Sequence, residues 1–208
     1  MPHEAGFWFA TNGQVPLIKS NEVNRGFYID PTIEHAYYSF TTNGIQSLSV
    51  FVEHVDETRP WIGTWTNQLL NGGSSNFPAS VQENLFMTTL GLETVRTLLS
   101  ESGFRLGAGL GLGYALGGAS ATVRNTSTNQ ITNYNSTNAW SGLFLEGFLR
   151  ARYSLFVTSQ YDFGIMAMGR FWGFPAIGPI GSPGGQYNGP QLRALSEFGY
   201  LAGLSVGF

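Results

Sequence analysis

Four glycines stand at alternate positions, 107–113, within the stretch LGAGLGLGYALGG (residues 106–118), and this spacing restricts what the chain can fold into. Each interior glycine costs a helix about 1 kcal/mol relative to alanine, which excludes a helix here. A two-residue period belongs to a β-strand, whose successive side chains point to opposite faces. One face then carries leucines and Tyr114, and the other has almost no side chains. The apolar face is expected to meet an apolar medium, and the glycine face a crowded interior.

The composition favours a β-protein that meets lipid. Only 11% of the residues are charged, against roughly 25% in a typical soluble domain, and 14% are aromatic. No run of about 18 apolar residues exists to form a membrane helix. Because the backbone must be hydrogen-bonded inside lipid, closed barrels are the remaining way to cross it. The net charge of −3 does not indicate a nucleic-acid-binding protein. The lack of cysteine excludes disulfides and thiolate metal sites.

Alternation of the same kind recurs along the chain and predicts eight strands in one domain, residues 1–208. The clearest examples are SLSVFVEHV, LFMTTLGLETV, GLFLEGFLRAR and the last segment, SEFGYLAGLSVGF. The predicted limits are 4–11, 26–40, 45–56, 84–97, 104–117, 139–152, 155–168 and 192–208.

The connections between these strands alternate in length. Three are short: TTNG, LLSESG and the point around Tyr153 and Ser154. Residues 12–25, 57–83, 118–138 and 169–191 form long ones. This pattern predicts an all-β transmembrane up-and-down antiparallel barrel with short periplasmic turns, long extracellular loops and both termini on the short-turn side. A soluble β-barrel is the alternative fold.

Most of the acidic residues fall at alternate positions of the predicted strands, so they lie on the same face of those strands. A polar network in the lumen is therefore expected, with Glu–Arg pairs and buried water, because unpaired buried charges cost several kcal/mol. A narrow cation-favouring path is the functional alternative, although eight strands enclose a space that side chains roughly fill. The expected lumen residues are Asp30, Glu34, Glu53, Glu93, Arg105, Glu146, Arg150, Asp162 and Glu197. His35 and His54 are assigned to the outer parity.

The last strand ends in aromatic alternation, FGYLAGLSVGF, with Phe208 at the terminus. It resembles the C-terminal signature of bacterial outer-membrane barrels, and the eight-strand pattern resembles the small-barrel group of the OmpA membrane domain, OmpX and OmpW. The resemblance implies an outer-membrane location, outer-membrane lipids and the barrel assembly machinery as partners, and a signal peptide already removed, since MPHEAGF shows no leader. The residues implied for the assembly signal are Tyr200, Leu204, Val206 and Phe208.

Three functions follow as hypotheses. The first is a structural or interaction barrel, with possible self-association, whose extracellular loops carry Trp61, Trp65, Phe171, Trp172 and Phe174. The second is a small channel or transporter for small or hydrophobic solutes, as in OmpW-like proteins. The third is a lipid-modifying enzyme, for which the Glu53–His54–Asp56 cluster is the only candidate acid/base group. The sequence shows neither a nucleophile motif nor the spacing of metal ligands. The sequence thus predicts no enzyme, no metal and no cofactor.

Overall fold

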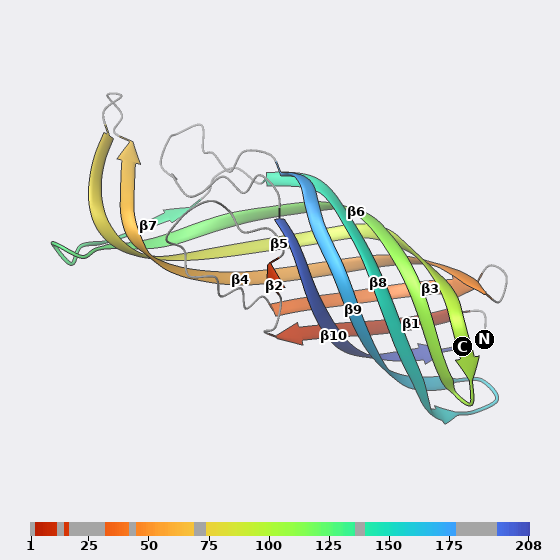
Figure 1. Cartoon of the computed structure of the whole chain (residues 1–208). Helices are drawn as coiled ribbons and strands as arrows, with labels where there is room; N and C mark the ends of the chain where they lie inside the picture. Colours follow the sequence, from red (N-terminus) through yellow and green to blue (C-terminus); the bar gives the residue numbers. More distant parts are fainter. Residues whose placement is uncertain are drawn as a thin grey trace.

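The computed structural model describes residues 3–11, 15–16, 32–41, 45–68, 74–135, 140–177 and 195–208. Eight long antiparallel strands form a closed ring in the order β1-β3-β4-β5-β6-β8-β9-β10, and β10 pairs back onto β1 (Figure 1). The expected all-β barrel is confirmed. The two termini meet at one end, where His3 N donates to Phe208 O at 3.2 Å. We call this end, which also carries the short turns, the short-turn end, and the opposite one the long-loop end.

The strands differ greatly in length, because three of them continue far beyond the others at the long-loop end (Figure 1). The two-residue β2 pairs with β10, and β7 pairs with β6. The bounds are β1 His3–Thr11, β2 Val15–Pro16, β3 Thr32–Thr41, β4 Gln46–Gln68, β5 Ser74–Glu101, β6 Phe104–Asn125, β7 Ile131–Asn135, β8 Trp140–Val157, β9 Asp162–Ile177 and β10 Leu195–Gly207.

The turn expected around Tyr153 and Ser154 lies further along the chain. β8 continues to Val157, and the turn is built by Thr158, whose Oγ1 accepts from Gln160 N at 3.2 Å and from Tyr161 N at 2.8 Å. A threonine hydroxyl that accepts backbone N–H groups two and three residues on forms a turn of its own. The strand expected over 155–168 is therefore displaced to 162–177.

Much of the expected long loops is strand. Residues 57–68 and 74–83 continue β4 and β5, which pair in unbroken register from Gln46↔Arg96 to Gln68↔Ser74. Residues 118–125 continue β6, and 131–135 form β7. Sequence reasoning missed these extensions because their side chains are polar on the outside, so the alternation that marks the lower strands disappears. We call this raised part, residues 57–68, 74–83, 118–125 and 131–135, the upper sheet.

The exterior of the barrel is a continuous apolar belt. Leu110, Leu112, Tyr114 and Leu116 of β6 are each more than half exposed. The other strands add members with the same parity: Phe7, Phe9, Tyr38, Phe40, Val50, Val52, Phe86, Leu90, Leu92, Leu143, Leu145, Leu149, Phe163, Ile165, Phe171, Phe198, Tyr200 and Leu204. The expected apolar outer face is thus confirmed for β4, β5, β6, β8, β9 and β10, whereas on β3 the outward residues are those of the parity expected inside.

The glycine face of β6 points inward, where larger neighbours occupy the space. A Cβ added at Gly109 would overlap the ring of Phe148, and one at Gly111 would overlap the carboxyl group of Glu146. A Cβ at Gly113 would lie 2.7 Å from Thr89 Cγ2. The alternating glycines therefore let bulky side chains from β5 and β8 cross the lumen beside β6.

Candidate functional site

The lumen is crossed at mid-height by a buried ionic cluster, the central network: His35, Glu53, Glu93, Glu146 and Arg170. These residues come from β3, β4, β5, β8 and β9, and none is more than 4% exposed. Arg170 Nη1 donates to Glu53 and, at 3.2 Å, to Glu146 Oε2, while Arg170 Nη2 donates to Glu53 Oε1 at 3.1 Å. A bidentate guanidinium–carboxylate pair of this kind fixes both side chains.

His35 extends the central network toward β5. Its Nδ1 lies 3.0 Å from Glu53 Oε2, and its Nε2 lies 2.9 Å from Glu93 Oε1, although the second angle is poor for a hydrogen bond. Only an imidazolium carries protons on both ring nitrogens, so this placement favours a charged His35. Two cationic groups then face three carboxyl groups. Glu146 Oε1 is buried without a hydrogen-bond partner in the described part of the chain.

Aromatic rings close the lumen around the central network. His35 stacks on Phe51 with ring centroids 4.9 Å apart, and Phe51 contacts Phe144 at 5.9 Å. Phe144 contacts Trp172 at 6.1 Å, and the guanidinium of Arg170 lies 5.2 Å from the centre of the Trp172 ring. All of these rings are buried. The section at this height is therefore filled with side chains, as expected for eight strands.

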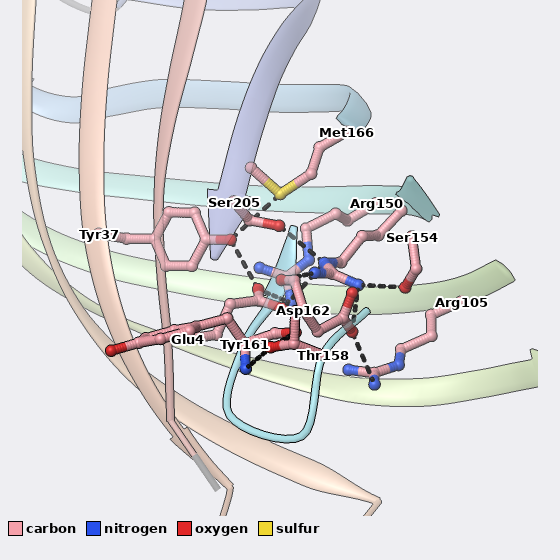
Figure 2. Close-up of polar contacts among 11 residues, drawn as sticks. Glu4, Tyr37, Arg105, Arg150, Ser154, Thr158, Tyr161, Asp162, Met166 and Ser205 are labelled. Carbon is pink, nitrogen blue, oxygen red and sulfur yellow. Dashed lines mark hydrogen bonds and ion pairs between the residues drawn. The ribbon is translucent and has the colours of Figure 1, made fainter. Parts of the chain in front are cut away.

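A second ionic cluster, the short-turn network, contains Glu4, Arg105, Arg150, Arg152 and Asp162 (Figure 2). Glu4 pairs with Arg150 at 3.3 Å and with Arg152 at 3.2 Å. Asp162 pairs with Arg152 at 2.9 Å and with Arg105 at 3.5 Å. Each carboxylate is thus shared by two guanidinium groups.

The two networks are separated by Tyr37. Its hydroxyl donates to Glu4 Oε1 at 2.6 Å and approaches Met166 Sδ at 3.1 Å, while Arg150 lies 5.3 Å from the centre of its ring. The ring of Trp8 stacks on Tyr37 at 6.3 Å. Figure 2 shows the Tyr37 hydroxyl directed toward Glu4 and Met166, with Arg150 nearby.

Most of the lumen residues expected from the sequence lie inside the barrel. Glu53, Glu93 and Glu146 join the central network, and Arg105, Arg150 and Asp162 join the short-turn network. Asp30 lies outside the described residues. Glu197 lies in β10 opposite Pro16 and Trp172, which places its backbone but not its side chain.

The assignments of Glu34 and His35 were reversed. Glu34 is exposed on the exterior of β3, and His35 is fully buried in the lumen. Glu34 was misplaced because acids were assumed to mark the inner face. Near the end of β3 toward the long loops, however, an acid can face outward above the apolar belt. The outward aromatic residues Tyr38 and Phe40 were the signal that sets the correct phase.

The residues expected on interaction loops lie in strands instead. Trp61 and Trp65 belong to β4, and Phe171, Trp172 and Phe174 belong to β9. Trp65 and Trp172 are buried inside, while Phe171 is exposed in the belt. Whether each side chain points inward or outward follows from its position in the two-residue period of the strand. The sequence pattern indicates loops here, so no inward or outward assignment is expected from it. The same error hid Arg170, whose position two residues before Trp172 places both side chains on the inner face.

The residues expected to form the assembly signal lie along the exterior of β10 and at the chain end. Tyr200, Leu204 and Phe208 are exposed, and Val206 is partly so. This exterior placement does not test their role in barrel assembly, which stays a prediction.

His54 lies on the exterior and is not part of either network. Its Nδ1 is 3.0 Å from Thr88 Oγ1, and its Nε2 is 3.2 Å from Asp56 Oδ2. Thr88, His54 and Asp56 therefore form a chain of contacts from a hydroxyl to an imidazole to a carboxylate. The backbone of these residues, however, is paired in the β4–β5 ladder. Those N–H groups are not available to stabilise an oxyanion, which acyl transfer requires. In the described segments, no three His, Asp or Glu side chains are placed to hold a metal ion.

No helix in the described part of the chain is long and apolar enough to cross a membrane. No family model matches the chain, and no curated protein does.

Several solved structures are similar to the chain along nearly its whole length. Ail, the attachment invasion locus protein of Yersinia pestis, in complex with the heparin analogue sucrose octasulfate, is 10% identical with a TM-score of 0.46, and 100% of both chains is covered. Neisserial surface protein A is 14% identical (TM-score 0.42; 99% and 96% covered). The outer membrane protein OprG from Pseudomonas aeruginosa is 12% identical (TM-score 0.43; 99% and 94% covered).

Proposed function

We propose that this chain is a bacterial outer-membrane barrel with a closed lumen, and that its role is structural or interactive and is carried by the upper sheet. The observation that carries this proposal is the division of β4, β5 and β6 into two parts. Their lower parts have an apolar exterior and a polar, filled interior. Their upper parts have a polar exterior, as a segment in water requires.

The height of the belt supports a membrane location. On β10 the exposed aromatic and aliphatic positions run from Phe198 to Phe208. Ten residue steps at about 3.3 Å cover about 33 Å along the strand. With the usual tilt of about 40°, this becomes about 25 Å along the barrel axis, the height of the apolar band of outer-membrane barrels. Soluble proteins rarely expose so large a continuous apolar surface.

One face of the upper sheet is apolar and buried, and it continues the core of the barrel. Trp65, Val81 and Val123, from three neighbouring strands, are each at most 2% exposed, and Ala79 and Ala121 lie beside them. The opposite face is mostly polar, with Asn76, Thr122 and Arg124 exposed, and it also carries Ile62 and Ile131, which are 73% and 57% exposed. A folded sheet that projects beyond the lipid offers a rigid surface to partners, which include a second copy of this chain.

The interaction role can be tested by shortening the β4–β5 hairpin. Pro60 pairs with Gln82, so replacing residues 61–81 by Asn-Gly preserves the register below the cut. We expect the shortened barrel to fold but not to restore the envelope phenotype of a deletion strain. A matched control replaces the exposed residues Ser159 and Gln160, in the short turn between β8 and β9, by alanine and should restore it fully. Full restoration by the shortened barrel would contradict the interaction role of the upper sheet but not the membrane location.

The closed lumen predicts that the protein does not conduct ions. Reconstituted into planar bilayers at 1 M KCl, it should show no stable single-channel steps, because the central network and its aromatic neighbours fill the section. The channel hypothesis predicts discrete steps whose size scales with salt. Such steps would show that the central network opens, and the channel would then replace the closed barrel as the account of function.

A closed barrel should also resist SDS in the cold, because it has no free edge from which to unravel. After refolding into detergent, the unboiled protein is expected to run faster than the boiled protein on a gel. Slower discrete bands that collapse on boiling would indicate self-association. Identical mobility, together with solubility in plain buffer, would indicate a soluble β-barrel.

A further inference from the structure

A polar cavity of about 280 Å³ opens inside the barrel at the short-turn end. Its charged lining comes from the short-turn network: Glu4, Arg105, Arg150, Arg152 and Asp162. The remaining wall is rich in hydroxyl groups, among them Ser39, Thr41, Ser47, Thr97 and Ser100. Its volume is at the lower end of the range of small-molecule sites, which suits a ligand of a few heavy atoms.

Three guanidinium groups in this lining face two carboxylates, so one positive charge is in excess. Arg152 is the most heavily engaged of the three: its Nε donates to Ser205 Oγ at 2.7 Å, and its Nη1 donates to Ser154 Oγ at 2.8 Å and to Asp162 Oδ2 at 2.9 Å. Its Nη2 donates to the Asp162 backbone carbonyl at 2.7 Å. Arg152 therefore uses four of its five N–H donors inside the barrel and serves mainly to hold Asp162.

Arg150 and Arg105 are engaged much less completely. Each makes one ion pair in the short-turn network, Arg150 with Glu4 at 3.3 Å and Arg105 with Asp162 at 3.5 Å. A guanidinium carries five N–H donors, and among the described residues each of these two makes fewer polar contacts than Arg152. The Arg105 side chain is 44% exposed and that of Arg150 is 12% exposed. One therefore stands at the mouth of the cavity and the other deep within it.

Behind the inner end of the cavity, Tyr37 contacts two of its lining residues, through its hydrogen bond to Glu4 and the approach of Arg150 to its ring, and the buried central network lies in the same lumen. Low-dielectric walls around a polar cavity concentrate the field of a charge in excess. The same surplus on an open surface would be screened by salt within about 10 Å.

The geometry points to an anion-binding site in this cavity, in which Arg105 and Arg150 bind a small oxyanion, either a phosphate or a carboxylate group, that enters from the short-turn end. Guanidinium groups bind such groups through paired charge-assisted hydrogen bonds. The hydroxyl-rich wall supplies further donors. This assignment is independent of the upper sheet and of any partner there.

Calorimetric titration of the refolded, detergent-solubilised protein with inorganic phosphate, and separately with citrate, tests this site at low ionic strength. We expect saturable one-site binding of at least one of the two anions. Arg105→Gln should weaken it about tenfold or more, the effect of losing one charged hydrogen-bonding group. Arg124→Gln is the matched control, because Arg124 lies exposed at the other end of the same strand, and affinity should change less than twofold.

Ser100→Asp is a second variant that keeps every arginine in place. It adds a carboxylate to the exposed rim and should abolish binding by cancelling the surplus charge. A preference for phosphate over citrate, or the reverse, identifies which oxyanion the site takes. Absence of saturable binding of both anions would overturn the proposal. So would equal weakening by Arg105→Gln and Arg124→Gln, which would indicate a general charge effect.

Discussion

Replacing Arg170 by methionine is expected to destabilise the barrel by about 3–5 kcal/mol, because it removes the buried cation that Glu53 and Glu146 share and leaves Glu53 with His35 alone. Arg170 is fully buried and is held by Glu53 and Glu146. Methionine retains much of the apolar stem, so the loss is mainly electrostatic. The measurement is the urea midpoint of unfolding in lipid vesicles, followed by tryptophan fluorescence. Among the side chains that the structure describes, the buried tryptophans Trp8, Trp65 and Trp172 report it.

Arg124→Met provides the control, since Arg124 is exposed on β6 and its loss should change stability by no more than about 0.5 kcal/mol. Adding Glu53→Gln to Arg170→Met should recover part of the loss, because it removes one of the stranded charges. Equal effects of Arg170→Met and Arg124→Met would mean that the central network does not hold the barrel together.

Gly109→Val is expected to prevent folding or to cost about 3 kcal/mol or more. Its Cβ would overlap the Phe148 ring and would lie 2.8 Å from the carbonyl oxygen of Thr94, a backbone atom that cannot move without breaking the ladder. Overpacking of this kind has no cheap relief, because the ring is buried between strands. The measured quantity is the fraction of protein that reaches the fast-running band on an unboiled gel.

Gly147→Ala on the neighbouring strand β8 is the matched control. Its added Cβ would meet only Leu110 Cδ2, at 3.6 Å, an ordinary van der Waals contact on the exterior. Alanine at this position should fold as well as glycine or slightly better, because it restricts the unfolded chain. If Gly109→Val folds as efficiently as Gly147→Ala, the glycine face of β6 does not serve to make room for lumen side chains.

The closed barrel could be predicted from the sequence because period-two alternation survives wherever a strand lies between lipid and a filled lumen. Leu110 and Leu112 face outward and Gly111 and Gly113 inward, as that period requires. The assumption that acids mark the interior worked for Glu53, Glu93 and Glu146, which lie at mid-height. It failed for Glu34, above the belt, where the outside is also polar.

The composition of the central network could be predicted only in part. A histidine with apolar and aromatic neighbours gives no sign that two glutamates from other strands will meet it, since that depends on the register of β3 against β4 and β5. Arg170 was hidden for a different reason. Its segment is rich in glycine, proline and aromatic residues, which are typical of loops, yet barrel closure pairs it with β8 and β10.

The most direct test of the lipid-facing belt is the accessibility of single spin labels along β6. The chain has no cysteine, so each introduced cysteine is labelled alone. In vesicles, labels at Leu110 and Leu112 should collide with dissolved oxygen more often than with a water-soluble nickel chelate. A label at Thr122, in the upper sheet, should show the reverse. If labels at Leu112 and Thr122 are equally accessible to the nickel chelate, the belt lies in water, and this chain is not a membrane barrel.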